Sequence, residues 1–242
     1  GSTVVIEEFM EGEEASLLAF VDGKTVVPMI ASQDHKRIFD GDKGPNTGGM
    51  GTYAPAPVLT DALRDEAMKT ILEPMVEAMQ KEGMPYVGCL YAGLMITPQG
   101  PKVVEFNARF GDPETQVVLP LLDSDLGQIM MACATGTLTA DMVKWKDSSA
   151  ACVILASKGY PETSSKGDVI HGDIKQHDTT IVFHSGTKLV GEEYVTNGGR
   201  VLGVVGLGKD LRTALDRAYG RIEHIDFEGM QYRTDIGAKA FK

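Results

Sequence analysis

The chain has 242 residues, of which 43% are hydrophobic and 24% are charged. This composition is typical of a globular protein with a sizeable core, organised as one large domain or two smaller ones, and is too apolar for a disordered chain. The formal net charge of -11 argues against nucleic acid or an anionic membrane as the main partner.

The three cysteines, Cys89, Cys133 and Cys152, are far apart and form no C-x-x-C pair. We therefore expect neither a disulfide framework nor a structural zinc site. Three unpaired cysteines fit a reducing compartment, so we expect a cytoplasmic location. No apolar run approaches the ~18–20 residues that a membrane-spanning helix needs, so we predict no membrane partner.

The first residues suggest a piece of a longer protein. Gly1-Ser2 resembles a remnant of an expression vector, and the next residues start as if in the middle of a strand. We predict a strand over 3–9. Two further apolar runs, 15–21 and 24–30, meet at Asp22-Gly23, which predicts a hairpin.

The middle of the chain alternates irregular and regular segments. Residues 40–57 are rich in Gly, Pro and Asp and are predicted to be irregular. The spacing of apolar residues over 60–82 predicts a helix that begins at Thr60, ends before Gly83 and is kinked at Pro74. Further predicted elements are strands 87–97 and 101–107, which form a hairpin, and helices 114–122 and 125–135.

The last third is predicted to be rich in strands. They lie near 150–157, 180–186, 187–190 and 200–207, and a helix capped by Asp210 follows over about 210–225. Strands and helices do not alternate regularly, so the fold class is α+β. We predict a domain with an antiparallel sheet and helices at 3–140 and a small β-rich domain with one helix at 148–242.

Glu105 and Asn107 are the strongest candidates for a metal site. Side chains two apart on a strand share a face, while Phe106 between them turns toward the core. A carboxylate and an amide oxygen suit a Mg²⁺ ion carried by nucleotide phosphates. Arg109 adds donors for a phosphate or acyl-phosphate oxygen. The alternative is a solvated strand edge with a surface ion pair.

Three polar stretches are open to two interpretations. The Gly-rich residues 40–51 could bind an anion through backbone N–H groups or form a flexible loop; they match neither an EF-hand nor a Walker A loop. The acidic residues 7–14 are either a nucleotide hinge or a solvated turn. Residues 34–37 could hold a substrate phosphate or pair at the surface.

Three stretches together carry a much more specific signal. They are V-I-E-E-F-M-E-G-E-E-A-S (5–16), Q-D-H-K-R-I-F-D-G-D-K-G-P-N-T-G-G-M-G (33–51) and K-V-V-E-F-N-A-R-F-G-D-P-E-T-Q (102–116). In this order and spacing the chain resembles glycinamide ribonucleotide synthetase, a ligase of the ATP-grasp superfamily. The resemblance covers nearly the whole chain and implies the C-terminal half of an ATP-grasp domain followed by the small β-rich domain.

The family joins glycine to 5-phosphoribosylamine in purine synthesis, with ATP and Mg²⁺. ATP first phosphorylates the glycine carboxylate, and the amine then attacks the glycyl phosphate. The resemblance implies that the metal ligands are Glu105 and Asn107, and that Arg109 is catalytic, stabilising the transferring phosphoryl group or the acyl phosphate.

The remaining implied residues divide into two groups. ATP would be bound by Glu7, Glu8, Phe9 and Met10 at the adenine and by Glu14 at the ribose. The ribose phosphate and glycine would be bound by Asp34, Lys36, Arg37, Asp42, Asn46, Thr47, Gly48, Gly49, Met50 and Gly51, with Gly111, Asp112 and Pro113 closing the glycine pocket.

The chain also departs from the superfamily pattern. If 97 pairs with 101 across the hairpin, Glu105 faces Gly93 and Asn107 faces Tyr91. Residues 91–95 then bring no second metal carboxylate, so we expect one Mg²⁺ ion. The N-terminal half of the enzyme, with the lysine that contacts the nucleotide phosphates, would precede residue 3.

We therefore expect the isolated chain to be weakly active or inactive. Two alternatives remain: a non-catalytic half that needs a partner chain, and another ATP-grasp carboxylate–amine ligase.

Overall fold

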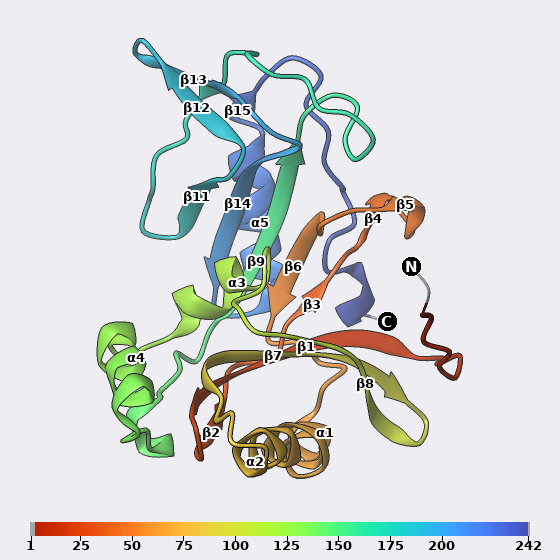
Figure 1. Ribbon diagram of the computed structural model, residues 1–242. Coiled ribbons are helices and arrows are strands. Elements are labelled where there is room, and N and C mark those ends of the chain that lie inside the picture. The colour runs from red at the N-terminus through yellow and green to blue at the C-terminus, as the bar shows by residue number, and fades with distance from the viewer. Residues whose placement is uncertain (1–2, 242) are drawn as a thin grey trace.

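The computed structural model describes residues 3–241, and the expected vector remnant Gly1-Ser2 lies outside the described residues. Figure 1 shows two sheets, one above the other, with helices below the lower sheet and behind the upper one. Among residues 3–241, no helix is long and apolar enough to cross a membrane.

The lower sheet is antiparallel, with four strands in the order β2-β1-β7-β8. Its strands are β1 (Glu13–Asp22), β2 (Val26–Pro28), β7 (Val87–Thr97) and β8 (Gly100–Asn107). The hairpin predicted at Asp22-Gly23 is confirmed: Asp22 Oδ1 accepts hydrogen bonds from the backbone N of Lys24 at 3.1 Å and of Thr25 at 2.7 Å. Gly23, with φ of 99°, adopts the conformation that the turn needs.

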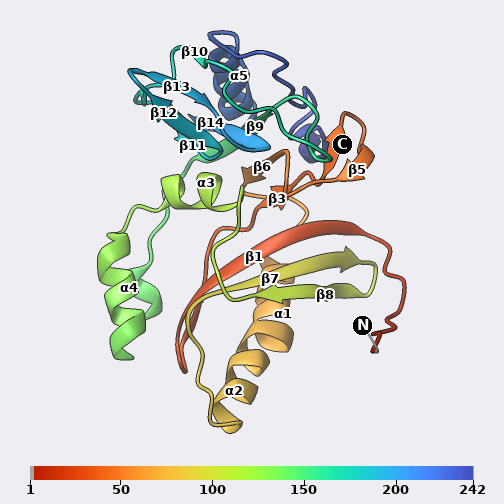
Figure 2. The same ribbon diagram turned by 45° about the horizontal axis from the view of Figure 1, so that its top comes forward.

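Helices bury both faces of this sheet. Leu17 and Ala19 of β1 pack in the same cluster as α1 (Asp61–Ala67), the π-helical η1 (Met68–Leu72) and α2 (Glu73–Lys81). Leu18 and Phe20 point to the other side, toward α4 (Leu126–Thr135). Because successive side chains alternate between faces, a strand buried on both sides is apolar throughout. Figure 2 shows these two helical layers.

The helix predicted over 60–82 is confirmed, with Thr60 Oγ1 accepting from the N of Leu63 at 3.4 Å. Its irregularity is the π-helical segment η1, which comes directly before Pro74 in the first turn of α2. Pro74 has no N–H to donate into the preceding turn, so the helix is irregular where the kink was predicted. Gly136, with φ of 69°, ends α4 as predicted.

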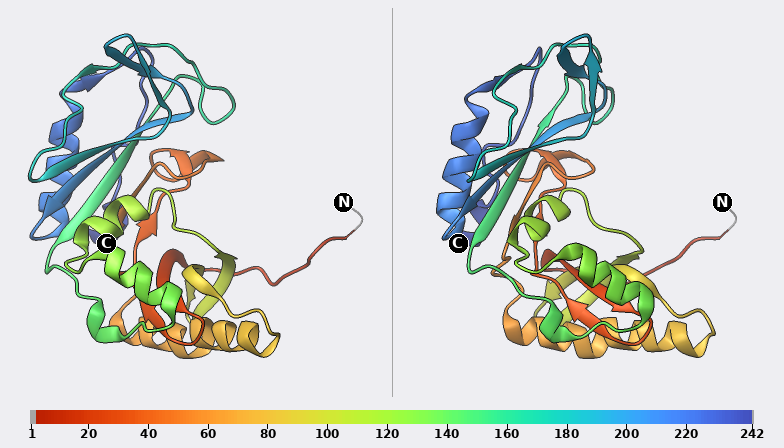
Figure 3. Two further views of the ribbon diagram at one scale, coloured as in Figure 1. Left: turned by 60° about the vertical axis from the view of Figure 1, so that its left-hand side comes forward. Right: turned by 90° about the vertical axis from the view of Figure 1, so that its left-hand side faces the viewer.

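The upper sheet has five strands in the order β11-β14-β9-β6-β3. They are β3 (Gln33–Asp34), β6 (Gly51–Ala54), β9 (Ser149–Ala156), β11 (Thr180–His184) and β14 (Arg200–Gly208). Helix α5 (Leu211–Ile222), capped by Asp210 as predicted, packs on β9 and β14, and Figure 3 shows it along one face of the sheet.

The other elements are short. They are the hairpin β4 (Arg37–Phe39) and β5 (Lys43–Asn46), α3 (Thr115–Val118), η2 (Leu119–Leu121), η3 (Ala140–Met142), β10 (His171–Gly172), β12 (Thr187–Val190), β13 (Glu193–Thr196), β15 (Ile225–Asp226) and η4 (Ala238–Phe241).

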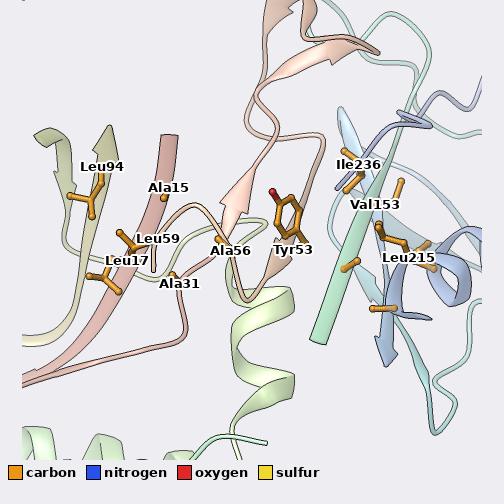
Figure 4. Packing of buried hydrophobic residues seen from close by; sticks show 14 of the residues in the cluster. Ala15, Leu17, Ala31, Tyr53, Ala56, Leu59, Leu94, Val153, Leu215 and Ile236 are labelled. Atoms are coloured by element: carbon orange, nitrogen blue, oxygen red, sulfur yellow. The ribbon is translucent and has the colours of Figure 1, made fainter. Parts of the chain in front are cut away.

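One sheet joins the two parts of the chain. β3 and β6 precede residue 60, yet β6 pairs with β9 from Gly51↔Val153 to Ala54↔Ala150. Tyr53 lies in the hydrophobic cluster that runs between the sheets, and Figure 4 shows it between Ala56 and Val153. The division into domains at 3–140 and 148–242 stays a prediction, and strands from both sides of it share this sheet.

Two predicted segments differ from the structure. Residues 3–9 form no strand; Ile6 is 92% and Phe9 is 90% exposed, because no described strand lies beside this segment to accept its hydrogen bonds. Residues 40–57 are not wholly irregular, since β5 and β6 lie within them. The Gly and Pro residues there shape the turns between these short strands.

The hairpin of β7 and β8 contains a bulge that alters its register. Thr97 pairs with Gly100. The expectation that residue 97 pairs with residue 101 is therefore wrong. A register shift between Gly93 and Leu94 then adds one residue on β8, and Glu105 does face Gly93 while Asn107 faces Tyr91. The predicted opposition at the candidate metal site is therefore confirmed.

Candidate functional site

Glu105 and Asn107 lie side by side at the end of β8. The Asn107 Nδ2 donates to Glu105 Oε1 at 3.0 Å, which leaves the amide oxygen of Asn107 free to bind another group. Phe106 packs against the hydrophobic cluster on the α2 side of the sheet, so the predicted alternation holds. The two oxygen-bearing side chains therefore present a common face, as a hard divalent cation requires.

Both side chains line a pocket of about 160 Å³. Its wall combines cationic, anionic and backbone groups: Asp34, Lys36, Thr47, Gly48, Tyr91, Arg109, Asp112 and Glu114. Arg109 is exposed, and its Nη1 donates to the backbone oxygen of Phe110 at 2.9 Å. The guanidinium keeps other donors for an anion in the pocket.

A buried network that the sequence analysis missed supports the pocket. Tyr91 OH donates to Glu114 Oε1 at 3.0 Å, and Ser16 Oγ lies 2.8 Å from Tyr91 OH and 3.2 Å from the same carboxylate oxygen. Glu114 is only 4% exposed. Three distant segments meet here; the hairpin register points to Tyr91 opposite Asn107, but no local signal marks Ser16 or Glu114.

Asp34 joins this pocket to a second one of about 300 Å³, because Asp34 and Lys36 line both. Burial raises the pKa of Asp34 to about 7, and the carboxylate of Glu114 adds to the rise more than the charge of Lys36 offsets it. A carboxyl group at this pKa is poised to exchange its proton near neutral pH.

Lys36 forms an ion pair with Glu14 of β1. Burial lowers the pKa of Lys36, but the hydrogen bond to Glu14 and the charges of Asp34 and Glu105 raise it overall, so the ammonium stays charged. Arg37, Asp42 and Asn46 line the same second pocket. Glu14 and the predicted phosphate-binding residues are thus neighbours.

Arg200 of β14 holds the Gly-rich loop against the turn at Asp112. Its Nη1 donates to the backbone oxygens of Gly48 at 2.8 Å and Asp112 at 2.9 Å. A Cβ on Gly49 would lie 2.5 Å from Pro113 Cδ, so only glycine lets the two loops approach this closely. The structure therefore brings 47–49 and 111–113 together, as a shared pocket for these segments requires.

Met50 and Gly51 lie beneath the loop. Met50 is fully buried beside Ile38 and Ala156, and Gly51 pairs with Val153 in the upper sheet. Pro113 and Gly111 are buried as well, whereas Asp112 is exposed at the pocket wall. These four buried residues shape the loops rather than line the pocket of Glu105.

The C-terminal segment anchors the β4–β5 hairpin. Arg233 is 1% exposed, and it donates to Asp42 Oδ1 at 2.8 Å and to Asp235 Oδ1 at 2.7 Å. Lys239 Nζ lies 2.7 Å from Asp42 Oδ2. Burial alone would raise the pKa values of Asp42 and Asp235. Hydrogen bonds from Lys239 and Arg233 lower the pKa of Asp42 overall, and those from Arg233 and the backbone N of Gly41 lower that of Asp235. Asp42 is therefore held by the protein itself.

The predicted adenine hinge lies at a third pocket. Glu8, Phe9 and Met10 line a depression of about 730 Å³ together with residues 96–99, and Glu8 pairs with Lys102. Glu7 is exposed and does not line this depression. Gly12 and Glu13 line both this depression and the pocket of Lys36. The three hollows thus adjoin one another from residue 8 to Asn107.

Family models match two parts of the chain. Residues 1–115 match "Phosphoribosylglycinamide synthetase, ATP-grasp (A) domain", and residues 150–239 match "Phosphoribosylglycinamide synthetase, C domain".

Curated relatives agree with these models. The chain is 56% identical to phosphoribosylamine–glycine ligase of Caulobacter vibrioides and 52% identical to that of Synechocystis, covering 100% and 98% of this chain but 57% of each relative. It is 52% identical to the trifunctional purine biosynthetic protein adenosine-3 of Gallus gallus, covering 99% of this chain and 24% of that protein. The chain therefore spans little more than half of the first two relatives.

Solved structures show the same fold. The crystal structure of phosphoribosylamine–glycine ligase from Thermotoga maritima superposes with a TM-score of 0.84 at 35% identity, covering 96% of this chain and 57% of that one. A biotin carboxylase domain of a thermophilic 2-oxoglutarate carboxylase superposes with a TM-score of 0.68 at 12% identity, which shows a shared fold alone. The expected α+β fold with part of an ATP-grasp domain is confirmed, and the chain belongs to the phosphoribosylglycinamide synthetase family.

Proposed function

We propose that this chain is part of a cytoplasmic ATP- and Mg²⁺-dependent ligase that joins glycine to 5-phosphoribosylamine in purine synthesis. The observation that carries the proposal is the meeting of Glu105, Asn107, Arg109 and Lys36 around one small pocket, beside the loop at Thr47-Gly48. The names of the relatives support the choice of substrates.

Glu105 and Asn107 would hold Mg²⁺. The fit rests on their oxygen donors, on the free amide oxygen of Asn107 and on their shared face. Among residues 3–241, no group of three or more His, Cys, Asp or Glu side chains is arranged to hold a metal, so nucleotide oxygens would complete the shell. When bound, the ion would neutralise phosphate charge.

ATP would lie along the three adjoining hollows. The adenine would be held by Glu7, Glu8, Phe9 and Met10, and the ribose by Glu14. The triphosphate would then extend past Lys36 toward Asn107. The support is that neighbouring hollows share lining residues. Gly12 and Glu13 line both the first and the second hollow, and Asp34 and Lys36 line both the second and the pocket of Glu105.

The acid and the amine would meet in the pocket of Glu105. Transfer of the terminal phosphoryl group to the glycine carboxylate gives glycyl phosphate and ADP, and Arg109 would stabilise the negative charge on the transferring group. The amine of phosphoribosylamine then attacks the carbonyl carbon, and phosphate leaves.

The loops around this pocket would bind the substrates. Glycine and the ribose phosphate would be held by Asp34, Lys36, Arg37, Asp42, Asn46, Thr47, Gly48 and Gly49, with Met50, Gly51, Gly111, Asp112 and Pro113 shaping these loops.

The test is ADP release with Mg²⁺, ATP, glycine and fresh phosphoribosylamine, using the chain alone and together with the N-terminal part that its relatives carry. We expect little release alone and release that needs both substrates when the parts are combined. Glu105→Ala should abolish it. Release with other acids or amines in preference to these two would favour a different ATP-grasp ligase.

A second candidate is a non-catalytic half that pairs with a separate partner chain, favoured by the 57% coverage of the relatives. A neighbouring coding sequence that ends with the first half would support it, and one continuous reading frame would exclude it.

A further inference from the structure

Both backbone polar groups of Gly48, at the wall of the small pocket, are bound by side chains from beyond residue 150. The Gly48 N–H donates to the hydroxyl of Tyr160 at 2.9 Å, and its carbonyl oxygen accepts from Arg200 Nη1 at 2.8 Å. The residues that line this pocket within the described part of the chain all lie between 34 and 114. Tyr160 therefore acts on the pocket wall from outside it.

The backbone N–H groups next to Gly48 are engaged within the protein as well. Their acceptors at distances of 2.7–2.9 Å are the backbone oxygen of Lys36 for Thr47, Thr47 Oγ1 for Gly49 and the backbone oxygen of His35 for Met50. An anion-binding nest needs N–H groups that point at the ligand. Residues 47–50 thus contribute a wall of defined shape to the pocket, and Tyr160 supplies the acceptor that completes it.

The ring of Tyr160 is closely packed, so its hydroxyl has a fixed place. The ring lies against the small hydrophobic cluster of Ile38, Met50 and Ala156. Gly199 lies against the ring too: a Cβ at this position would come within 2.2 Å of Tyr160 Cδ2. Only glycine allows this approach, and the ring is held where it reaches Gly48.

The backbone around Tyr160 is supported by two other segments of the C-terminal part. Ser157 N donates to the backbone oxygen of Gly199 at 2.8 Å, and Ser157 Oγ to that of Gly198 at 2.9 Å. Gln231 Nε2 donates to the backbone oxygens of Ser157 at 2.8 Å and Tyr160 at 3.1 Å. Segments 157–160 and 197–200 are therefore joined to each other and to Gln231.

The exposure of Gly48 separates an effect on position from an effect on stability. Gly48 is exposed, so water can replace the Tyr160 hydroxyl as acceptor at little cost to the folded state. Water does not hold the N–H in one direction, whereas a packed side chain does. A displacement of about 1 Å near reacting groups can lower a rate roughly 100-fold.

We propose that Tyr160 is a positioning residue for the ligation, an inference that rests on the proposed function. Its hydroxyl, through Gly48, fixes the loop at 47–49 in the arrangement in which the pocket of Glu105 and Asn107 is competent. The small β-rich part of the chain thereby contributes to the reaction through Tyr160 and Arg200, although neither lines the pocket.

The test uses the full-length enzyme, in which the N-terminal part carried by the relatives precedes this chain. Tyr160→Phe removes the hydroxyl and keeps the ring. Gly199→Ala keeps the hydroxyl and displaces the ring. Tyr86→Phe is the matched control, because it also removes a hydroxyl bonded to the backbone, at 2.6 Å from the oxygen of Cys89 in the lower sheet. Steady-state kinetics and hydrogen-exchange mass spectrometry of the peptide containing 47–50 are measured for each.

We expect Tyr160→Phe to lower kcat/KM for glycine roughly 10- to 100-fold, because the loop loses its fixed orientation. The KM for ATP should change by less than about twofold, since the depression lined by residues 8–13 and 96–99 does not include the loop. Gly199→Ala should act in the same direction. Exchange should become faster in the peptide with 47–50, and Tyr86→Phe should match the unaltered enzyme in both measurements.

Two results would overturn the inference. One is an unchanged kcat/KM for glycine in folded Tyr160→Phe, and the other is an equal loss in Tyr86→Phe, which would show a general effect of removing a hydroxyl. Failure of the unaltered enzyme to form ADP from glycine and phosphoribosylamine would overturn the proposed function instead. Unchanged exchange at 47–50 in Tyr160→Phe would exclude the positioning role whichever reaction the enzyme catalyses.

Discussion

Arg200 contacts Asp112 twice: its Nη1 donates to the backbone oxygen at 2.9 Å and lies 3.2 Å from the carboxylate Oδ1. The same nitrogen donates to Gly48, so one side chain from β14 fixes two loops that are more than sixty residues apart in the sequence. The small pocket depends on a residue outside the stretch that carries the proposed metal ligands.

Replacing Arg200 should loosen these loops. We expect Arg200→Met to lower kcat/KM for glycine at least ~10-fold and the free energy of unfolding by about 1 kcal/mol, because three backbone oxygens lose their donor. Arg200→Lys should recover only part of the activity, since an ammonium cannot reproduce the planar donor geometry. Denaturant unfolding and steady-state kinetics measure the two effects, and unchanged kinetics in Arg200→Met would contradict the role.

Removing the carboxylate at Glu105 should weaken the response to Mg²⁺. In the full-length enzyme we expect Glu105→Gln to raise the Mg²⁺ concentration for half-maximal ADP release at least ~10-fold, because an anionic ligand becomes neutral. A Mg²⁺ titration at fixed ATP measures this. An identical titration curve for variant and unaltered enzyme would remove Glu105 from the metal site.

Arg233 should matter for stability more than exposed arginines do. We expect Arg233→Met to lower the free energy of unfolding by about 2–4 kcal/mol, because Asp42 and Asp235 lose a buried partner. Arg64→Met is the matched control: Arg64 pairs only with exposed carboxylates of its own helix, so its loss should cost less than about 0.5 kcal/mol. Urea denaturation compares the two.

His35 should make the chain sensitive to mild acid. Burial, with the charges of Arg233 and Lys239, lowers the pKa of His35 from 6.5 to about 4. The unfolded chain therefore binds the proton first, and the folded state loses stability as pH falls from 6.5 to 4, by roughly 3 kcal/mol. His35→Gln should lose this contribution, which unfolding curves at several pH values can show. Parallel pH profiles for both proteins would contradict it.

Asp34 should make the folded chain less stable as pH rises, the opposite of the effect of His35. Its folded pKa of about 7 lies above the ordinary value of 3.8, so the folded state binds the extra proton and loses stability as pH rises between these values. Asp34→Asn removes the penalty, and we expect the variant to be more stable than the unaltered chain at pH 8 by more than about 1 kcal/mol. Thermal unfolding at pH 5 and pH 8 compares them; an equal difference at both would contradict the raised pKa.

Local signals predicted the fold well where short stretches decide the structure. The turn between two strands was marked by Asp22-Gly23, the starts of two helices by Thr60 and Asp210, and the end of α4 by Gly136, all at the observed positions. The strand predicted over 3–9 is wrong because pairing depends on a neighbouring strand, which apolar residues alone do not supply.

The candidate site shows the same limit. Strand alternation predicted that Glu105 and Asn107 share a face, and the structure bears this out. The register opposite them is as expected only because a bulge compensates for the shorter turn. Glu114 and Arg200 reach the pocket through contacts between segments 88 to 152 residues apart, and no local pattern encodes such contacts.

The pairing of β6 with β9 has a consequence for any attempt to shorten the protein. A piece that stopped near residue 140 would keep β6, whose four residues are all buried, but would lose the strand that satisfies one of its edges. Such an open, apolar edge recruits other chains. Truncation between the two matched regions should therefore yield insoluble material, and useful deletion variants would have to keep both regions or lose the strand at Gly51–Ala54 as well.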